Sequence, residues 1–245
     1  RERAPGPRGP GRTSLPAGRM SHLLPRNLAR AFLKNAGSQI VGRLFLTGVR
    51  FLIAILIVRE AGVAVYGEFA LILSLLLFMD ALVDFGMSEA VVRVICQQPE
   101  RSRELTLGLA RAKLIMAVVA TGVMVLLMGL LQYPAHMMIA GAIGLIEIFV
   151  FAGVLVFRAY FRSVMKMERE VFAEMISVVV MLPLIVVAAL FYPSLPVFIG
   201  CYVFSRLVFL FSCWRFARNC VPHIREPLRP GTLKFVFTES ATLGV

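Results

Sequence analysis

Long apolar runs separated by short charged clusters constrain this chain more than any other feature. Of its residues, 59% are apolar and only 16% are charged, whereas about a quarter are charged in a typical soluble domain. A helix needs about 20 residues to cross a lipid core, where its backbone groups must be satisfied internally. The sequence therefore predicts an all-α, polytopic transmembrane helix bundle with six spans, at residues 40–58, 69–87, 114–131, 136–157, 171–191 and 197–214.

The two ends of the chain differ from this central region. Residues 1–34 begin with a stretch rich in Pro, Gly and Arg, which we expect to be a disordered leader followed by a cytoplasmic amino-terminal segment. Residues 35–214 are the expected six-helix transmembrane lobe, and residues 215–234 are a basic cytoplasmic loop. The apolar residues 235–245 are too few to cross a membrane, so we expect them to begin a seventh helix that continues in a longer chain.

Lys and Arg are concentrated on one side of the predicted bundle. The amino-terminal segment and the loops after the second, fourth and sixth spans each carry several basic residues. The loops on the other side carry Arg59 alone. Because basic loops are retained in the cytoplasm, this asymmetry predicts a cytoplasmic amino terminus.

Several classes of function are disfavoured by composition and spacing. The net charge of +12 does not indicate nucleic-acid binding, because the basic residues lie at the ends of apolar spans and not on one soluble face. The three His residues are scattered, and no Gly-rich phosphate loop follows a strand. The four Cys residues form no C-x-x-C pair and are interpreted as small buried hydrophobic residues. We therefore expect no metal, no cofactor, no catalytic residue and no nucleic-acid partner.

Ionisable side chains inside the spans are the most informative residues. An Arg or Asp at the centre of a membrane helix costs about 2.5–3.5 kcal/mol on insertion, so such residues should face the bundle interior or a water-filled cavity. Depths along helices that rise 1.5 Å per residue give three possible pairs. These pairs are Arg50–Asp80, Arg43–Asp84 and Glu147–Arg206.

Two interpretations of these pairs stay open. They either hold the bundle together without touching a substrate, or they line a cavity that binds an anionic head group. Desolvation offsets much of the attraction in a buried pair, which favours the cavity for the four residues near mid-membrane. Arg43 and Asp84 lie in the cytoplasmic third, from which either can snorkel to the interface, and they fit both interpretations.

Short motifs near the helix ends resemble one family. Along the chain they are Asn35, Gln39 and Gly42-Arg43, then Arg59-Glu60-Ala61-Gly62, Tyr66-Gly67-Glu68-Phe69, Asp84-Phe85-Gly86, Val92-Arg93 and Arg158-Ala159-Tyr160-Phe161-Arg162. From residue 34 to residue 245 the chain resembles the amino-terminal half of the Wzx-type O-antigen and exopolysaccharide flippases. These are the polysaccharide biosynthesis proteins of the multidrug/oligosaccharidyl-lipid/polysaccharide exporter superfamily.

The resemblance implies one half of a two-lobed transporter with a central cavity. It implies transfer of an undecaprenyl-pyrophosphate-linked oligosaccharide from the cytoplasmic to the periplasmic leaflet of the cell inner membrane by alternating access. The pathway would be O-antigen (lipopolysaccharide) or exopolysaccharide biosynthesis. The implied partners are the lipid bilayer, the lipid-linked oligosaccharide, and polysaccharide polymerase and chain-length proteins.

Two other classes of protein share the predicted spans. A cation-coupled multidrug exporter of the same superfamily would need an acidic cavity, whereas the candidate residues balance three Arg against three carboxylates. A membrane enzyme that acts on lipid-linked sugars generally needs a substantial periplasmic catalytic loop, and the predicted outer loops are very short. The sequence therefore favours a flippase that is not an enzyme.

Overall fold

The computed structural model describes residues 26–97, 102–164 and 166–218, which are helical apart from short turns. The helices are α1 (Arg26–Ala61), α2 (Val63–Asp84), α3 (Met87–Gln97), α4 (Ser102–Leu130), α5 (Ala135–Ser163), α6 (Met167–Phe191) and α7 (Leu195–Arg218). In these ranges six helical stretches are long and apolar enough to cross a membrane, with α2 and α3 together forming one of them. The predicted all-α membrane bundle is confirmed. The predicted leader, most of the basic loop and the start of a seventh helix lie outside the described residues.

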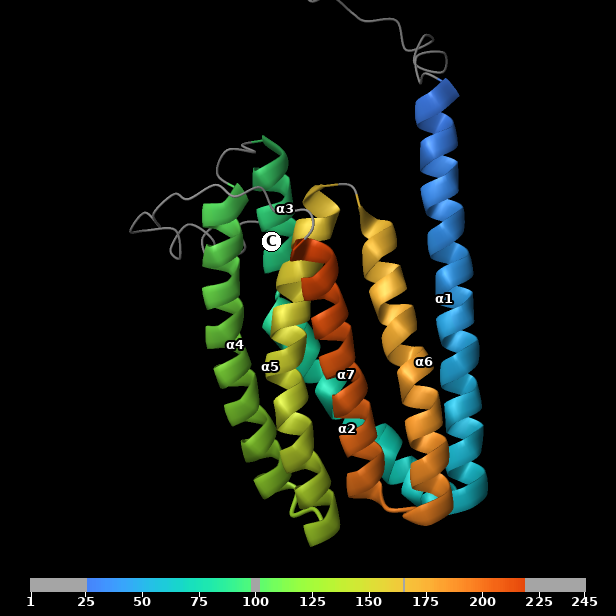
Figure 1. Cartoon of the computed structure of the whole chain (residues 1–245). Helices are drawn as coiled ribbons and strands as arrows, with labels where there is room; N and C mark the ends of the chain where they lie inside the picture. The colour runs from blue at the N-terminus through green and yellow to red at the C-terminus, as the bar shows by residue number, and fades with distance from the viewer. Residues whose placement is uncertain (1–25, 98–101, 165, 219–245) are drawn as a thin grey trace, which may run out of the picture.

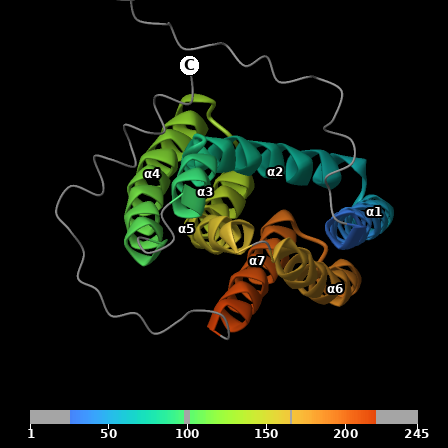
Figure 2. The ribbon, with the colours of Figure 1, turned by 90° about the horizontal axis from the view of Figure 1, so that it is seen from above.

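The spans stand side by side and enclose a common interior (Figure 1). α1 packs against α6, α6 against α7, and α7 against α5, while α4 packs on another side of α5. Seen from above, α2 crosses the bundle obliquely from α1 toward α3 and α5 (Figure 2). The five helices α1, α2, α5, α6 and α7 therefore surround the interior, and α5 is the most buried of the spans.

Close packing of apolar side chains joins the helices. Phe69 of α2 meets Phe198 of α7 edge to face, with 6.4 Å between the ring centroids. Gly42 of α1 lets Val171 of α6 approach, because a Cβ atom at this position would overlap Val171 Cγ1. Contacts of this kind are the main source of helix association in lipid, which solvates apolar side chains as well as a protein core does.

Phe85 and Gly86 break the second span into α2 and α3. Both residues have positive φ angles, 35° and 71°, a conformation that costs Gly little and Phe more. The break leaves carbonyl groups at the end of α2 without helical partners. Lys113 of α4, which is 1% exposed, donates to the carbonyls of Val83 (3.3 Å) and Asp84 (3.1 Å) and forms an ion pair with the Asp84 carboxylate. The ammonium group of a residue on a neighbouring helix thus supplies hydrogen bonds to the carbonyl groups at the break.

Two expectations from the sequence are wrong in this region. The sequence places Lys113 in a cytoplasmic loop, but α4 already begins at Ser102 and buries it. The sequence also pairs Asp84 with Arg43, whereas the partner of Asp84 is Lys113. Hydropathy detects the apolar part of a helix, so the polar first turns of α4 and the short amphipathic α3 escape it.

Candidate functional site

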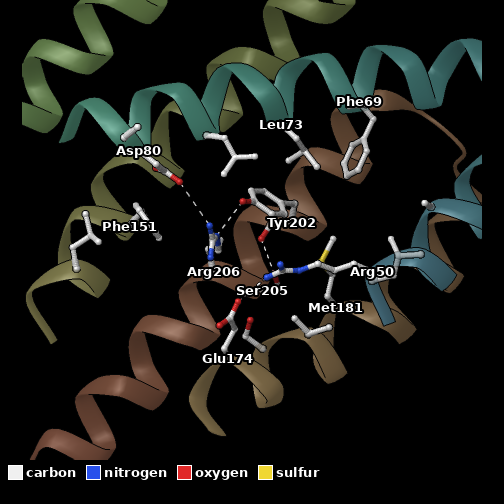
Figure 3. Close-up of a pocket in the computed structure, with 18 of the residues that line it drawn as sticks. Arg50, Phe69, Leu73, Asp80, Phe151, Glu174, Met181, Tyr202, Ser205 and Arg206 are labelled. Atoms are coloured by element: carbon white, nitrogen blue, oxygen red, sulfur yellow. Dashed lines mark hydrogen bonds and ion pairs between the residues drawn. The ribbon is translucent and has the colours of Figure 1, made fainter. Parts of the chain in front are cut away.

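A cavity of about 600 Å³ lies in the interior, bounded by α1, α2, α5, α6 and α7 (Figure 3). Much of its wall is apolar or aromatic, including Phe69, Phe151 and Tyr202. Charged side chains enter it from all five helices, namely Arg50, Asp80, Asp84, Arg158, Glu174 and Arg206. A mostly apolar pocket with a few convergent polar groups is the usual form of a ligand site. The structure thus brings four of the six candidate residues from the sequence into one cavity.

Arg206 of α7 lies at one side of this cavity and is held by several partners. Its Nε donates to Glu147 Oε1 (2.9 Å) and to the Tyr202 hydroxyl (3.1 Å), and its guanidinium lies 3.8 Å from the Asp80 carboxylate. The guanidinium also lies over the rings of Phe151 and Tyr202, at 4.9 and 5.3 Å from their centroids. Arg206 is 13% exposed and Glu147 is fully buried. We call Arg206, Glu147, Asp80 and Tyr202 the Arg206 cluster.

The Arg206 cluster contains more acidic than basic groups. Both Asp80 carboxylate oxygens and Glu147 Oε2 are buried and accept no hydrogen bond within the described part of the chain. One guanidinium balances one carboxylate, so the second is in excess in a site that water hardly reaches. The Nε–H of Arg206 is committed to Glu147 and Tyr202, its guanidinium charge faces two carboxylates, and the cluster joins α2, α5 and α7.

One of the ion pairs predicted from depth in the membrane occurs in the Arg206 cluster, and another predicted pair does not form. Glu147 and Arg206 form the predicted pair. Asp80 lies on the Arg206 side of the cavity and does not pair with Arg50 as predicted. The cause is the oblique course of α2, which carries Asp80 away from α1 (Figure 2). Depth along a helix gives the height of a residue in the membrane and leaves its lateral position undetermined.

Arg50 of α1 forms an ion pair with Glu174 of α6 at 2.6 Å (Figure 3). Both side chains line the cavity, and the Arg50 side chain is 56% exposed while that of Glu174 is 20% exposed. More than half of the Arg50 side chain is left uncovered by the bundle, whereas Arg206 is 13% exposed. The guanidinium of Arg50 is therefore held loosely, in contrast to that of Arg206.

A second network of ion pairs lies where α3, α5 and α6 meet. Arg158 pairs with Glu170 at 2.6 Å, and Arg162 pairs with Glu89 and lies 4.0 Å from Glu170. Arg43, the remaining candidate from the sequence, lines a smaller cavity of about 360 Å³ beside this network. Arg43 is thus separated from the larger cavity that the other candidates line or adjoin.

Sequence reasoning missed Glu174 and Arg158 as cavity residues. Glu174 follows Glu170 by four positions and Arg158 precedes Arg162 by four, so each pair shares one helix face. Charged residues at this spacing inside or beside an apolar span are the signal that would have found them. The predicted fourth span ends at residue 157 and leaves Arg158 and Arg162 in a loop, whereas both lie in α5.

Within the described ranges, no group of three or more His, Cys, Asp or Glu side chains is placed to hold a metal ion. The described cysteines, Cys96, Cys201 and Cys213, are free thiols. The groups that line the larger cavity are guanidinium, carboxylate, hydroxyl and aromatic groups.

In the described residues, six helical stretches of membrane length, five of which border an interior cavity with charged walls, define a multi-pass membrane protein of the transporter class. The family model described as polysaccharide biosynthesis protein matches residues 32–245, and the chain belongs to this family. The family is that of the Wzx-type polysaccharide flippases and exporters, so the resemblance drawn from the motifs is confirmed. The chain matches no curated protein and no solved structure.

Proposed function

We propose that this chain forms one lobe of a flippase for an undecaprenyl-pyrophosphate-linked oligosaccharide in O-antigen or exopolysaccharide biosynthesis. The family supports a role in polysaccharide export in general, and a transporter rather than an enzyme. The observation that carries the substrate class is Arg50, whose side chain is 56% exposed and lines a cavity inside a membrane-spanning bundle. Arg within a span is costly and is commonly functional, and its planar fork binds phosphate oxygens in pairs.

The charges of the cavity favour this cargo over the cation of a multidrug exporter. Three guanidinium groups and three carboxylates line the cavity, at Arg50, Arg158 and Arg206 and at Asp80, Asp84 and Glu174. A carrier of cations is expected to present an excess of accessible acidic groups. The cavity lining shows no such excess, and the additional carboxylate of the Arg206 cluster, Glu147, is fully buried behind it.

Deletion of the gene in its source strain tests the proposal. We expect the deleted strain to lose surface polymer and to accumulate the lipid-linked oligosaccharide at the cytoplasmic face, and the full-length gene to restore export. Normal surface polymer in the deleted strain would contradict the proposal. Efflux of a cationic dye that depends on the gene, with surface polymer unchanged, would instead support the drug exporter.

We further propose that the protein lies in the cell inner membrane with its amino terminus in the cytoplasm, beside polysaccharide polymerase and chain-length proteins. The support for the orientation is electrostatic. The last turns of α5 and the first turn of α6, which contain Arg158, Arg162 and Arg169, are at the end of the bundle where α1 begins (Figure 1). The turn between α6 and α7, at the other end, carries no charge. Basic segments of this kind are retained on the cytoplasmic side.

Single cysteines in a Cys-free background test the orientation. Ser194 is exposed in the turn between α6 and α7, and Glu168 is exposed in the first turn of α6 at the opposite end. We expect Ser194→Cys to react with an impermeant thiol reagent applied from the periplasmic side, and Glu168→Cys to react only after the membrane is opened. Labelling in the reverse order would overturn the orientation.

A further inference from the structure

We propose that Glu174 competes internally for Arg50: its carboxylate holds the guanidinium in this structure and gives it up to the pyrophosphate of the arriving substrate. This inference rests on the proposed function and concerns how the same site releases its load. It assigns Glu174 the role of setting the affinity for the anionic head group.

Arg50 is the cavity cation whose partner can be exchanged most easily. If Arg206 turned toward a ligand, the carboxylate of Glu147, which is fully buried and 2.9 Å from Arg206, would lose its cation. Arg158 and its partner Glu170 are 22% and 13% exposed, so their pair is also largely shielded. The Arg50 side chain is 56% exposed and lines the cavity, so a ligand there can meet its guanidinium without uncovering a buried group.

The chemistry of the two anions favours exchange in the direction of the substrate. A pyrophosphate carries more negative charge than a carboxylate and offers several oxygens to the planar guanidinium fork. The pair it replaces is a contact between Arg50 Nη2 and one Glu174 oxygen at 2.6 Å, which leaves room for an anion that engages more of the fork. On leaving Arg50, the Glu174 carboxylate can turn toward Ser177, which follows it by three residues and lines the same cavity.

The displaced carboxylate also promotes release. Glu174 stays tethered to α6, within reach of the guanidinium it has left, so it repels the bound phosphate and competes for the same donors. A transport site must bind strongly enough to load and weakly enough to unload. A carboxylate beside the phosphate-binding Arg lowers affinity without removing the cation, and so meets both requirements.

Binding of farnesyl pyrophosphate to the full-length protein in lipid nanodiscs tests the inference. Glu174→Gln keeps the shape of the side chain and removes the competing charge. We expect it to bind the probe roughly two- to fivefold more tightly, the range that corresponds to loss of a solvent-accessible ion pair. Dissociation should slow correspondingly, because affinity changes within one site arise mainly in the off-rate.

Two controls separate competition from a structural role. Glu168→Gln removes the same charge from an exposed position on the same helix and should leave the affinity unchanged. In an Arg50→Ala background, Glu174→Gln should lose most of its effect, because no guanidinium remains for which to compete. Equal or weaker binding by Glu174→Gln, or failure of this variant to fold, would overturn the inference.

The test distinguishes this inference from the proposed function. If the parent protein binds the probe and exports polymer but Glu174→Gln binds no tighter, the flippase assignment stands and the competition is wrong. If the parent neither binds the probe nor restores export in the deleted strain, both are wrong.

Discussion

Replacing Arg206 with Met is expected to prevent recovery of the full-length protein in a folded, monodisperse form. The change leaves Glu147 and Asp80 in the bundle interior without a cation, where each is at most 6% exposed. Removing one member of a buried ion pair typically costs about 3–5 kcal/mol. Size-exclusion chromatography after extraction, followed by a heat challenge, measures the loss. Arg218→Met, which removes the same charge from the exposed end of α7, is the matched control and should behave as the parent does.

The carboxylates of the Arg206 cluster should show redundancy. Glu147→Gln or Asp80→Asn alone leaves one carboxylate near the guanidinium, so each is expected to be milder than Arg206→Met. Neutralising all three residues together should recover much of the stability that Arg206→Met loses, because no buried charge is then unpaired. Strictly additive losses across these variants would show that the cluster does not act as one electrostatic unit.

Replacing Arg50 with Ala is expected to abolish export while leaving the fold intact. Arg50 is more than half exposed, and its described ion pair is with Glu174, so its removal disturbs packing little. A hydrogen bond to a charged group contributes about 1.5–3 kcal/mol, which corresponds to roughly a ten- to hundredfold loss of affinity for the pyrophosphate. Arg50→Lys keeps the charge but loses the planar fork, so partial export is expected. Surface polymer per molecule of membrane-inserted protein is the measurement.

The control for Arg50 lies on the same helix. Arg59 is 80% exposed at the far end of α1 and pairs with its neighbour Glu60, so Arg59→Ala should export as the parent does. Normal export by Arg50→Ala at normal protein levels would show that Arg50 has a structural role only, and would remove the main support for the pyrophosphate assignment.

Much of the fold could be predicted from the sequence because lipid permits few solutions. Each apolar run of near-spanning length had to be helical, and all six are, although the second is broken at Phe85 and Gly86. The pairing of Glu147 with Arg206 could also be predicted, since both lie near mid-depth and neither can be left alone there.

The lateral arrangement of the helices could not be predicted in this way. Nothing in the apolar pattern indicates that α1 packs on α6. This packing places Arg50 in contact with Glu174. The oblique course of α2 likewise places Asp80 beside Arg206. The break at Phe85 and Gly86 lies inside the Asp84-Phe85-Gly86 motif, whose apolar and polar pattern does not indicate a break. A one-dimensional depth scale cannot resolve such neighbours, because residues at equal height can lie on opposite sides of a bundle.

Transbilayer movement of the lipid-linked oligosaccharide in proteoliposomes tests the central claim most directly. The purified full-length protein and its Arg50→Ala variant are reconstituted with a labelled undecaprenyl-pyrophosphate-linked sugar, and the fraction accessible from outside is followed over time. We predict that the parent equilibrates the label between leaflets and that Arg50→Ala is slower by roughly tenfold or more. Movement by the parent at the rate of protein-free vesicles, or equal movement by both proteins, would contradict the assignment of this cavity to the pyrophosphate head group.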